Sequence, residues 1–208
     1  CWQARSGMNQ FVENYKITGN TEWLDAGIKY YDYLVGRMFT DPDGYKGWIG
    51  PYDYDRRYWI DALVGDGLLL SGMLEFCELV TEDQSLKDKY GAKADTYVML
   101  AKRGFVEKWD KRGCFYDDDP YGSYVFPVNF LNPGDLSRWV YAPETNRAGV
   151  SLPFNQQMDL AEVCILLSRI TGEKFYWDRA EKIFYTFKSH FQYFDNHYCW
   201  SYFDPLTP

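Results

Sequence analysis

Apolar residues recur at helical spacing on both sides of a short turn near residue 172. Before the turn, a 3.6-residue period is held by Met158, Ala161, Ile165, Leu166 and Ile170. After it, residues 175–191 carry a second apolar stripe made by Ala180, Ile183, Phe184 and Phe187. Gly172 stands where a helix C-terminus favours a residue that can adopt positive φ. The pattern predicts two helices joined by a tight turn.

The same unit recurs near the start of the chain, at an offset of 153 residues. Ile17-Thr18-Gly19 matches Ile170-Thr171-Gly172 without a gap. Identical residues at this offset are Gln3/Gln156, Asp25/Asp178, Lys29/Lys182 and Tyr45/Tyr198. Apolar or aromatic character is kept at Trp23/Tyr176, Leu24/Trp177, Tyr31/Phe184 and Leu34/Phe187. An internal repeat of this kind indicates a stack of similar supersecondary units.

A third unit lies between these two, with an apolar helix over residues 67–80 and a return helix over residues 87–109. We therefore expect an all-α protein built from three antiparallel helical hairpins, over residues 1–40, 62–110 and 152–194. Stacked hairpins bury their apolar stripes on one another, so residues 1–208 are expected to form one domain. The segments after the return helices, residues 41–57, 111–150 and 195–208, are expected to be aromatic loops.

Composition narrows the class of partner. Aromatic residues make up 20% of the chain, more than a core of this size requires, so many rings are expected at the surface or in a cleft. Sugar rings, with flat apolar faces and polar rims, suit such surfaces. The net charge of −8 argues against nucleic acid, which requires basic patches. We expect no membrane span, because the longest apolar stretch, near residues 62–70, is short and is interrupted by Gly65, Asp66 and Gly67.

The pattern resembles a known superfamily. It is carried by Leu152-Pro153-Phe154-Asn155-Gln156-Gln157, an amphipathic helix, Ile170-Thr171-Gly172, a second helix, and Tyr198-Cys199-Trp200-Ser201-Tyr202. This arrangement is similar to the six-hairpin (α/α) toroids, which include glycoside hydrolases, unsaturated-uronyl hydrolases, polysaccharide lyases and the helical domain of uronyl epimerases. The resemblance implies a partial or complete (α/α) toroid. Three hairpins fall short of six, so further hairpins would come from a longer chain or a second subunit.

One candidate site lies in residues 48–61. It combines carboxylates with aromatic rings, and two adjacent arginines could hold a substrate carboxylate in bidentate fashion. Candidate catalytic residues here are Asp53, Tyr58 and Asp61, and candidate substrate-binding residues are Trp48, Tyr52, Arg56, Arg57 and Trp59. The Trp59-Ile60-Asp61 segment resembles the tryptophan–aspartate segment of uronyl hydrolases, in which the carboxylate acts as acid or base. The alternative is a loop packed by its own aromatic rings, with a solvated charge cluster.

A second candidate site lies before the third hairpin. Glu144 is a candidate catalytic carboxylate, and the candidate binding residues are Arg138, Trp139, Tyr141, Arg147, Asn155 and Gln156. Unpaired N–H groups at a helix N-terminus favour an anion, so Asn155 or Gln156 could neutralise a sugar carboxylate. Trp200 is a further candidate for stacking on a sugar. The alternative is a helix start capped by Asn155.

The sequence indicates no metal and no cofactor. The acidic stretches 41–44 and 117–119 lack the twelve-residue calcium-loop pattern and are interpreted as turns. Five Cys residues fit no zinc spacing. Cys77 and Cys164 are expected in the core, and a Cys114–Cys199 disulfide stays open as an alternative to free thiols.

Three functions are compatible with these features. We favour a lyase that cleaves a uronate-containing glycan by β-elimination, with Arg, Asn or Gln neutralising the carboxylate and Tyr or His moving the proton. The alternatives are a glycoside hydrolase using paired carboxylates, including the unsaturated-uronyl type, and a non-catalytic helical module that binds glycan. The expected partner is a poly- or oligosaccharide, and a periplasmic or extracellular location is favoured.

Overall fold

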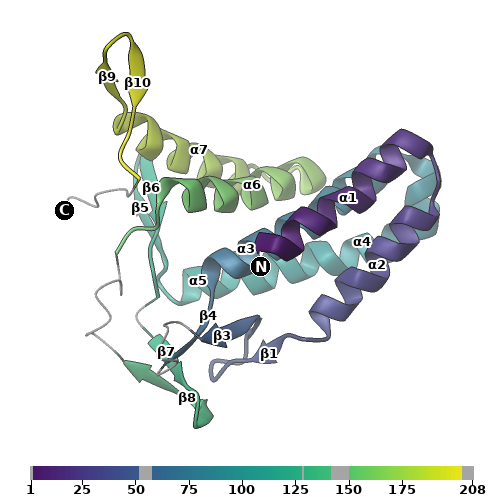
Figure 1. Ribbon diagram of the computed structural model, residues 1–208, viewed down its shortest axis with the longest axis horizontal. Coiled ribbons are helices and arrows are strands. Elements are labelled where there is room, and N and C mark those ends of the chain that lie inside the picture. Colours follow the sequence, from purple (N-terminus) through teal and green to yellow (C-terminus); the bar gives the residue numbers. More distant parts are fainter. Residues whose placement is uncertain (1, 52–57, 128, 142–149, 203–208) are drawn as a thin grey trace.

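The computed structural model describes residues 2–51, 58–127, 129–141 and 150–202. Their helices form three antiparallel pairs (Figure 1). The first pair is α1 (Trp2–Thr18) with α2 (Glu22–Val35), and the third is α6 (Phe154–Thr171) with α7 (Lys174–Ser189). The second is α3 (Leu63–Glu82) with a return helix made of α4 (Gln84–Ala101), the π-helical segment η1 (Lys102–Glu107) and α5 (Lys108–Lys111).

Helix α3 is the centre of the core. It is apolar on nearly all sides, and it contacts α1, α4 and α6. A helix without a polar face is stable only when other helices surround it. Around α3 the largest fully buried side chains include Trp109, Tyr31, Tyr97 and Phe76. Cys77 and Cys164 are buried in the same core, as expected.

The expected helix ends are confirmed where glycine terminates the first helix of a pair. Gly19 has φ of 66° and Gly172 has φ of 73°, both in the left-handed region that favours glycine. The second pair turns differently. There the Asp83 side chain accepts hydrogen bonds from the backbone N–H groups of Ser85 (2.7 Å) and Leu86 (3.2 Å), and so caps α4.

The all-α prediction is wrong. Four small antiparallel sheets lie in or directly beside the segments expected to be loops, and β1 and β9 fall at the ends of predicted hairpins, so the described chain is mixed α+β. β1 (Phe39–Thr40) pairs with β2 (Lys46–Gly47), β5 (Phe115–Asp118) with β6 (Tyr121–Tyr124), and β9 (Gln192–Phe194) with β10 (His197–Cys199). The largest sheet has the order β3 (Ile49–Pro51), β4 (Trp59–Asp61), β7 (Asn129–Asn132), β8 (Asp135–Tyr141).

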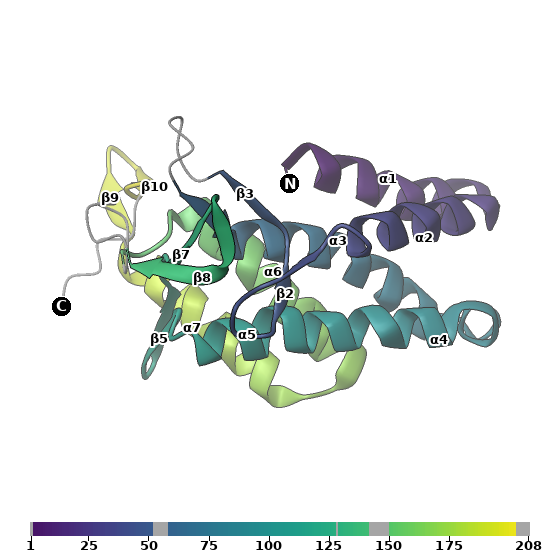
Figure 2. The same ribbon diagram turned by 90° about the horizontal axis from the view of Figure 1, so that it is seen from below.

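The toroid is wrong for the same reason. The described residues do not close a ring of six helix pairs, and much of the remaining chain pairs as β-ribbons instead. The physical cause is composition: aromatic residues fit a pleated, half-buried surface, and turn residues between them allow hairpins. The ribbons gather at one end of the helices, opposite the tight helix–helix turns (Figure 2).

Candidate functional site

Six charged side chains from four separate segments meet where the helices end and the strands begin. Asp41 and Asp43 come from the β1–β2 hairpin, Asp61 ends β4, and Asp66 lies in the first turn of α3. Lys108 begins α5, and Arg112 follows its last residue. We call this set the charge cluster: Asp41, Asp43, Asp61, Asp66, Lys108 and Arg112.

Lys108 is the inner cation of the cluster, and its side chain has no exposed surface. Its Nζ donates to Asp61 Oδ2 (2.7 Å), to Asp66 Oδ2 and to the backbone oxygen of Lys46 (3.0 Å). Burial alone would lower the pKa of Lys108, but the charges of Asp66 and Asp61 outweigh burial and raise it. A buried charge with three acceptors stays ionised, so Lys108 ties β2, β4 and α3 together.

Arg112 is the outer cation. It donates to Asp61 Oδ2 (2.7 Å), Asp41 Oδ2 (2.7 Å) and both carboxylate oxygens of Asp43 (2.8 and 2.9 Å). Its guanidinium carbon lies 4.7 Å from the ring centre of Trp109 and 5.1 Å from that of Trp139. Only a planar guanidinium can bond several carboxylates at its edge while its faces contact two indole rings.

The carboxyl groups of Asp41 and Asp61 lie close enough for each to shift the pKa of the other, and the buried Oδ1 atom of each has no hydrogen-bond partner among the described residues. Burial, and then the interaction with the Asp61 carboxyl group, raise the pKa of Asp41 to about 8. Burial opposes ionisation of Asp61 as well, but Lys108, Asp41 and Arg112 together hold the pKa of Asp61 below its ordinary value. These opposite shifts favour the proton on Asp41 and the negative charge on Asp61.

Two further carboxylates flank this pair. Burial, followed by the charge of Asp61, raises the pKa of Asp66 to about 7. Asp66 also accepts from the Trp109 indole N–H (3.1 Å). Burial alone would raise the pKa of Asp43, but its hydrogen bonds from Arg112 lower it. The cluster thus holds carboxyl groups of opposite protonation state within one network.

The backbone is shaped to admit this network. A Cβ on Gly47 would lie 2.0 Å from Asp61 Oδ1, so only glycine lets β2 approach the carboxylate. The π-helical segment η1 ends directly before Lys108. One extra residue in a helical turn rotates all later side chains by about 100°, and π-helical turns are frequent at functional sites.

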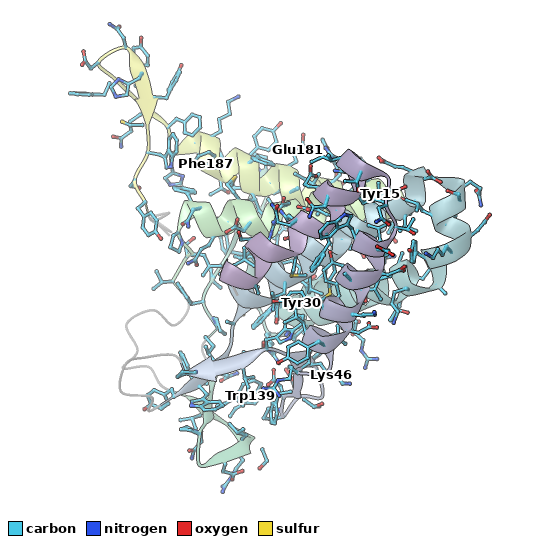
Figure 3. All side chains as sticks on the ribbon, turned by 45° about the vertical axis from the view of Figure 1, so that its right-hand side comes forward. Tyr15, Tyr30, Lys46, Trp139, Glu181 and Phe187 are labelled. Carbon is cyan, nitrogen blue, oxygen red and sulfur yellow. The ribbon has the colours of Figure 1, made fainter. Side chains whose placement is uncertain are left out.

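The cluster opens to solvent at a small cavity of about 30 Å³, which has room for one water molecule or one sugar hydroxyl. Its wall is formed by Asp43, Asp61, Trp109, Arg112, Pro127, Asn129 and Trp139. We call the outer part of this cavity, made by Asp43, Asn129 and Trp139, the mouth. Figure 3 shows Trp139 and Lys46 in the part of the molecule that carries the strands, away from Glu181 and Phe187 on α7.

Three candidates predicted from the sequence lie in or beside this site. Asp61 is at its centre, although it contacts Lys108 and Arg112 rather than an open cleft. Trp139 forms the mouth. The Trp48 indole N–H donates to the backbone oxygen of Leu34 (2.7 Å), and its backbone N–H reaches Asp66 (3.5 Å), so Trp48 supports the site from the protein side.

The other described candidates lie outside the cluster. Tyr58 packs against Phe130 with ring centres 5.8 Å apart, and Trp59 pairs with Leu131 in the sheet. Arg138 is exposed and pairs with Asp135 (2.7 Å). Tyr141 ends β8, and only its backbone is described.

The candidates at the start of the third helix pair are also separate from the cluster. Asn155 is exposed and is not the α6 N-cap, which is Pro153. Gln156 is half-buried. Trp200 is half-exposed and packs on Phe187 and Phe191, with ring centres 5.1 and 5.6 Å away.

Six predicted site residues lie outside the described residues: Tyr52, Asp53, Arg56, Arg57, Glu144 and Arg147. Conversely, Asp41, Asp43, Asp66, Lys108, Arg112 and Asn129 were not predicted as site residues. The signal for the cations was available in the sequence. Lys108 and Arg112 are four residues apart, and so share one face of a helix whose neighbours Val106 and Trp109 are apolar.

The acidic turn at residues 41–44 contacts a cation of the protein itself, Arg112. Among the described residues, no group of three or more His, Cys, Asp and Glu side chains is arranged to hold a metal ion. Cys114 and Cys199 are free thiols, so the disulfide alternative is wrong. No helix in the described part of the chain is long and apolar enough to cross a membrane.

Comparison with known proteins gave no match to a family model, to a curated protein or to a solved structure. The resemblance seen in the sequence therefore stays a prediction, and the functional argument depends on the geometry of the site.

Proposed function

We propose that the protein is a carbohydrate-active enzyme that hydrolyses glycosidic bonds with the carboxyl groups of the charge cluster. The observation that supports this most is the placement of Asp43 and Asp61 in the wall of one cavity, with Asp41, whose pKa is raised to about 8, beside Asp61. Glycoside hydrolysis uses one carboxyl group that donates a proton and one that is ionised.

The mouth supplies the contacts that a sugar requires. The indole face of Trp139 suits the apolar face of a sugar ring, and the Asn129 amide can hydrogen-bond a hydroxyl. Asp43 has the most accessible side chain of the four carboxylates in the cluster. Hydrogen bonds from Arg112 lower its pKa and so favour its ionised form. In this proposal Asp43 takes a proton from a water molecule held in the cavity as that water attacks the anomeric carbon. The glycosidic C–O bond breaks, and Asp61, which lines the cavity, passes the proton of Asp41 to the departing oxygen.

The elimination that we favoured from the sequence requires an Arg, Asn or Gln side chain to neutralise a uronate. Among the described candidates, Arg138 is paired with Asp135, and Asn155 and Gln156 lie at the start of α6, apart from the charge cluster. The carboxyl groups of the cluster therefore support the hydrolase alternative better. The two reactions leave different products, because elimination creates a carbon–carbon double bond and hydrolysis consumes water.

The test uses the full chain with a panel of neutral and uronate-containing polysaccharides. Release of reducing ends without ultraviolet absorbance from an unsaturated product is expected. Asp43→Asn should lower the rate by about a hundredfold or more, because a positioned acid or base contributes that much. Asp88→Asn on the exposed face of α4 is the matched control and should leave the rate unchanged.

Each other outcome rejects the proposal in a defined way. Unsaturated product would establish elimination. Glycan binding measured by calorimetry, with no product over the whole panel, would establish a binding module. Normal turnover by a folded Asp43→Asn variant would remove the charge cluster from the reaction.

A further inference from the structure

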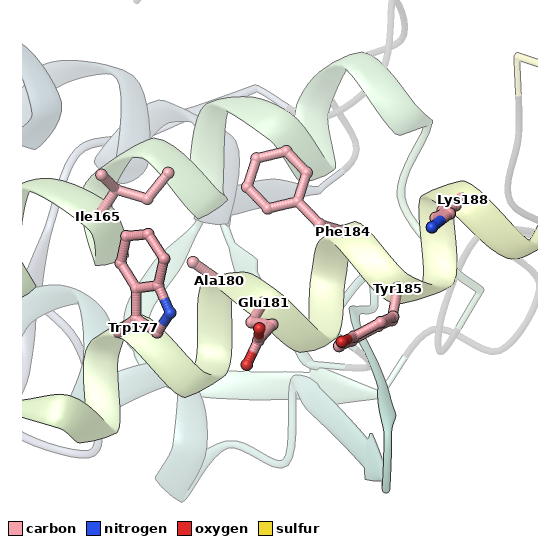
Figure 4. Close-up of a pocket in the computed structure, with 7 residues that line it drawn as sticks. All are labelled: Ile165, Trp177, Ala180, Glu181, Phe184, Tyr185 and Lys188. Carbon is pink, nitrogen blue, oxygen red and sulfur yellow. The ribbon is translucent and has the colours of Figure 1, made fainter.

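An apolar groove of about 270 Å³ runs along the third helix pair, far from the charge cluster. Trp177 and Phe184 reach from α7 towards Ile165 on α6, and Tyr185 continues the same surface (Figure 4). Trp177 is 49% exposed and Phe184 is 43% exposed. Large aromatic rings that are exposed together on one helix indicate a binding surface.

The internal repeat shows how this fold treats the same face elsewhere. At the offset of 153 residues, Trp177 corresponds to Leu24 and Phe184 to Tyr31. In the first helix pair these two positions are 1% and 0% exposed, because the second pair packs over them: Tyr31 contacts Phe76 of α3 and Tyr97 of α4. The groove on the third helix pair is therefore the counterpart of a face that, in the first pair, is covered by the helices of the second pair.

Two charges at the groove indicate which helix covers it. Glu181 and Lys188 both line the groove and lie seven residues, or two helical turns, apart. Neither forms an ion pair within the described residues, whereas the neighbouring Lys174 and Lys182 pair with Asp178 and Asp117. Phe184 and Tyr185 lie midway between the two charges. This arrangement is self-complementary for a second α7 running in the opposite direction.

We propose that the groove is a homodimer interface in which α7 packs antiparallel on α7 of a second copy. The twofold axis passes beside Phe184 and Tyr185, so Glu181 of each copy faces Lys188 of the other. A twofold contact uses one patch twice and closes on itself, and it is the commonest symmetry of soluble oligomers. Tyr193 and Phe194 are exposed in the β9–β10 hairpin that follows α7, and the proposal places them in the contact as well, because a stable contact requires about 1,000 Å².

The dimer is tested by light scattering and sedimentation of the full chain over a wide concentration range. A dimer that dissociates on dilution is expected. Glu181→Lys and Lys188→Glu each place two pairs of like charges across the axis, so each should weaken self-association by about tenfold or more. Both side chains are exposed, so neither change should disturb folding.

The deciding measurement is the equimolar mixture of the two single variants. In the mixed dimer every Lys faces a Glu, so association should return to the wild-type level. Lys87→Glu on the exposed surface of α4 is the matched charge reversal and should leave association unchanged. A monomer at every concentration would overturn the proposal, and so would a mixture no tighter than its two components.

Discussion

At the scale of the residue, the buried pair of Asp41 and Asp61 is the most consequential feature. Asp61 was identified from the sequence because it follows Trp59-Ile60, but its partners were not. Lys108 and Arg112 lie 47 and 51 residues further along the chain. A sequence pattern reports short spacings, whereas this network depends on how a hairpin, a strand and two helix ends meet in three dimensions.

The raised pKa values of Asp41 and Asp66 predict how stability depends on pH. An acid whose pKa rises on folding stabilises the folded state most at low pH. This stabilisation is lost as the pH rises from about 4, the ordinary value for aspartate, to the raised value. Asp41, with a pKa of about 8, and Asp66, with a pKa of about 7, both act in this direction. The free energy of unfolding should therefore fall between pH 5 and pH 8, by at most about 1.4 kcal/mol per pH unit for each group.

Asp41→Asn tests this directly, because an amide has nearly the same shape as the carboxyl group and does not titrate. Urea unfolding at several pH values should show a shallower fall for Asp41→Asn than for the wild type. Asp88→Asn on the surface of α4 should keep the wild-type dependence. Equal slopes for all three proteins would mean that Asp41 is ionised in the folded state.

At the scale of the element, periodicity predicted helices well and strands poorly. Apart from the short segments η1 and α5, each helix of the three pairs is 14 or more residues long and carries an apolar stripe. Glycines mark two of the turns between paired helices. The strands are two to seven residues long, too short for alternation to stand out. The β9–β10 hairpin did have a signal: Asp195 and Asn196 take positive φ of 46° and 64° at its turn, and these residue types tolerate that region.

The helix-terminating glycines give a prediction with an internal contrast. Gly172→Ala should destabilise the protein by about 1 kcal/mol, because an L-residue at φ of 73° is strained. Gly7→Ala should stabilise it by up to about 1 kcal/mol, since Gly7 lies inside α1 and a methyl group there meets no atom within 4 Å. Thermal or urea unfolding measures both changes. Shifts in the same direction would contradict this account of the turn.

At the scale of the whole molecule, the fold class was wrong although the helix pairs lie within the predicted ranges, apart from one residue at the end of α5. The error arose from treating aromatic, glycine-rich segments as connections, when they form sheets that carry half of the charge cluster. Arg5 of α1 links helices of all three pairs through its hydrogen bonds. It donates to Ser71 of α3 (2.7 Å), to Glu75 of α3 (3.4 Å) and to Glu162 of α6.

Arg5 should therefore matter more for stability than a surface arginine. Arg5→Met keeps the apolar stem but leaves two carboxylates without their cation, so unfolding free energy should fall by about 1–3 kcal/mol. Arg169→Met removes an exposed pair with Glu78 (3.4 Å) and should change stability by less than about 0.5 kcal/mol. Hydrogen exchange should quicken in both α1 and α6 for Arg5→Met only. Equal losses for the two variants would show that Arg5 does not link the helix pairs.

The position of Arg112 between Trp109 and Trp139 has a consequence for thermodynamic linkage. One side of this guanidinium faces the mouth, and its edge bonds the carboxyl group that holds the buried proton. A ligand that draws Arg112 outwards removes the cation that favours ionised Asp41. The affinity of Asp41 for its proton then rises. Occupancy of the mouth and proton uptake by the protein are then reciprocal, and the affinity of each depends on the other.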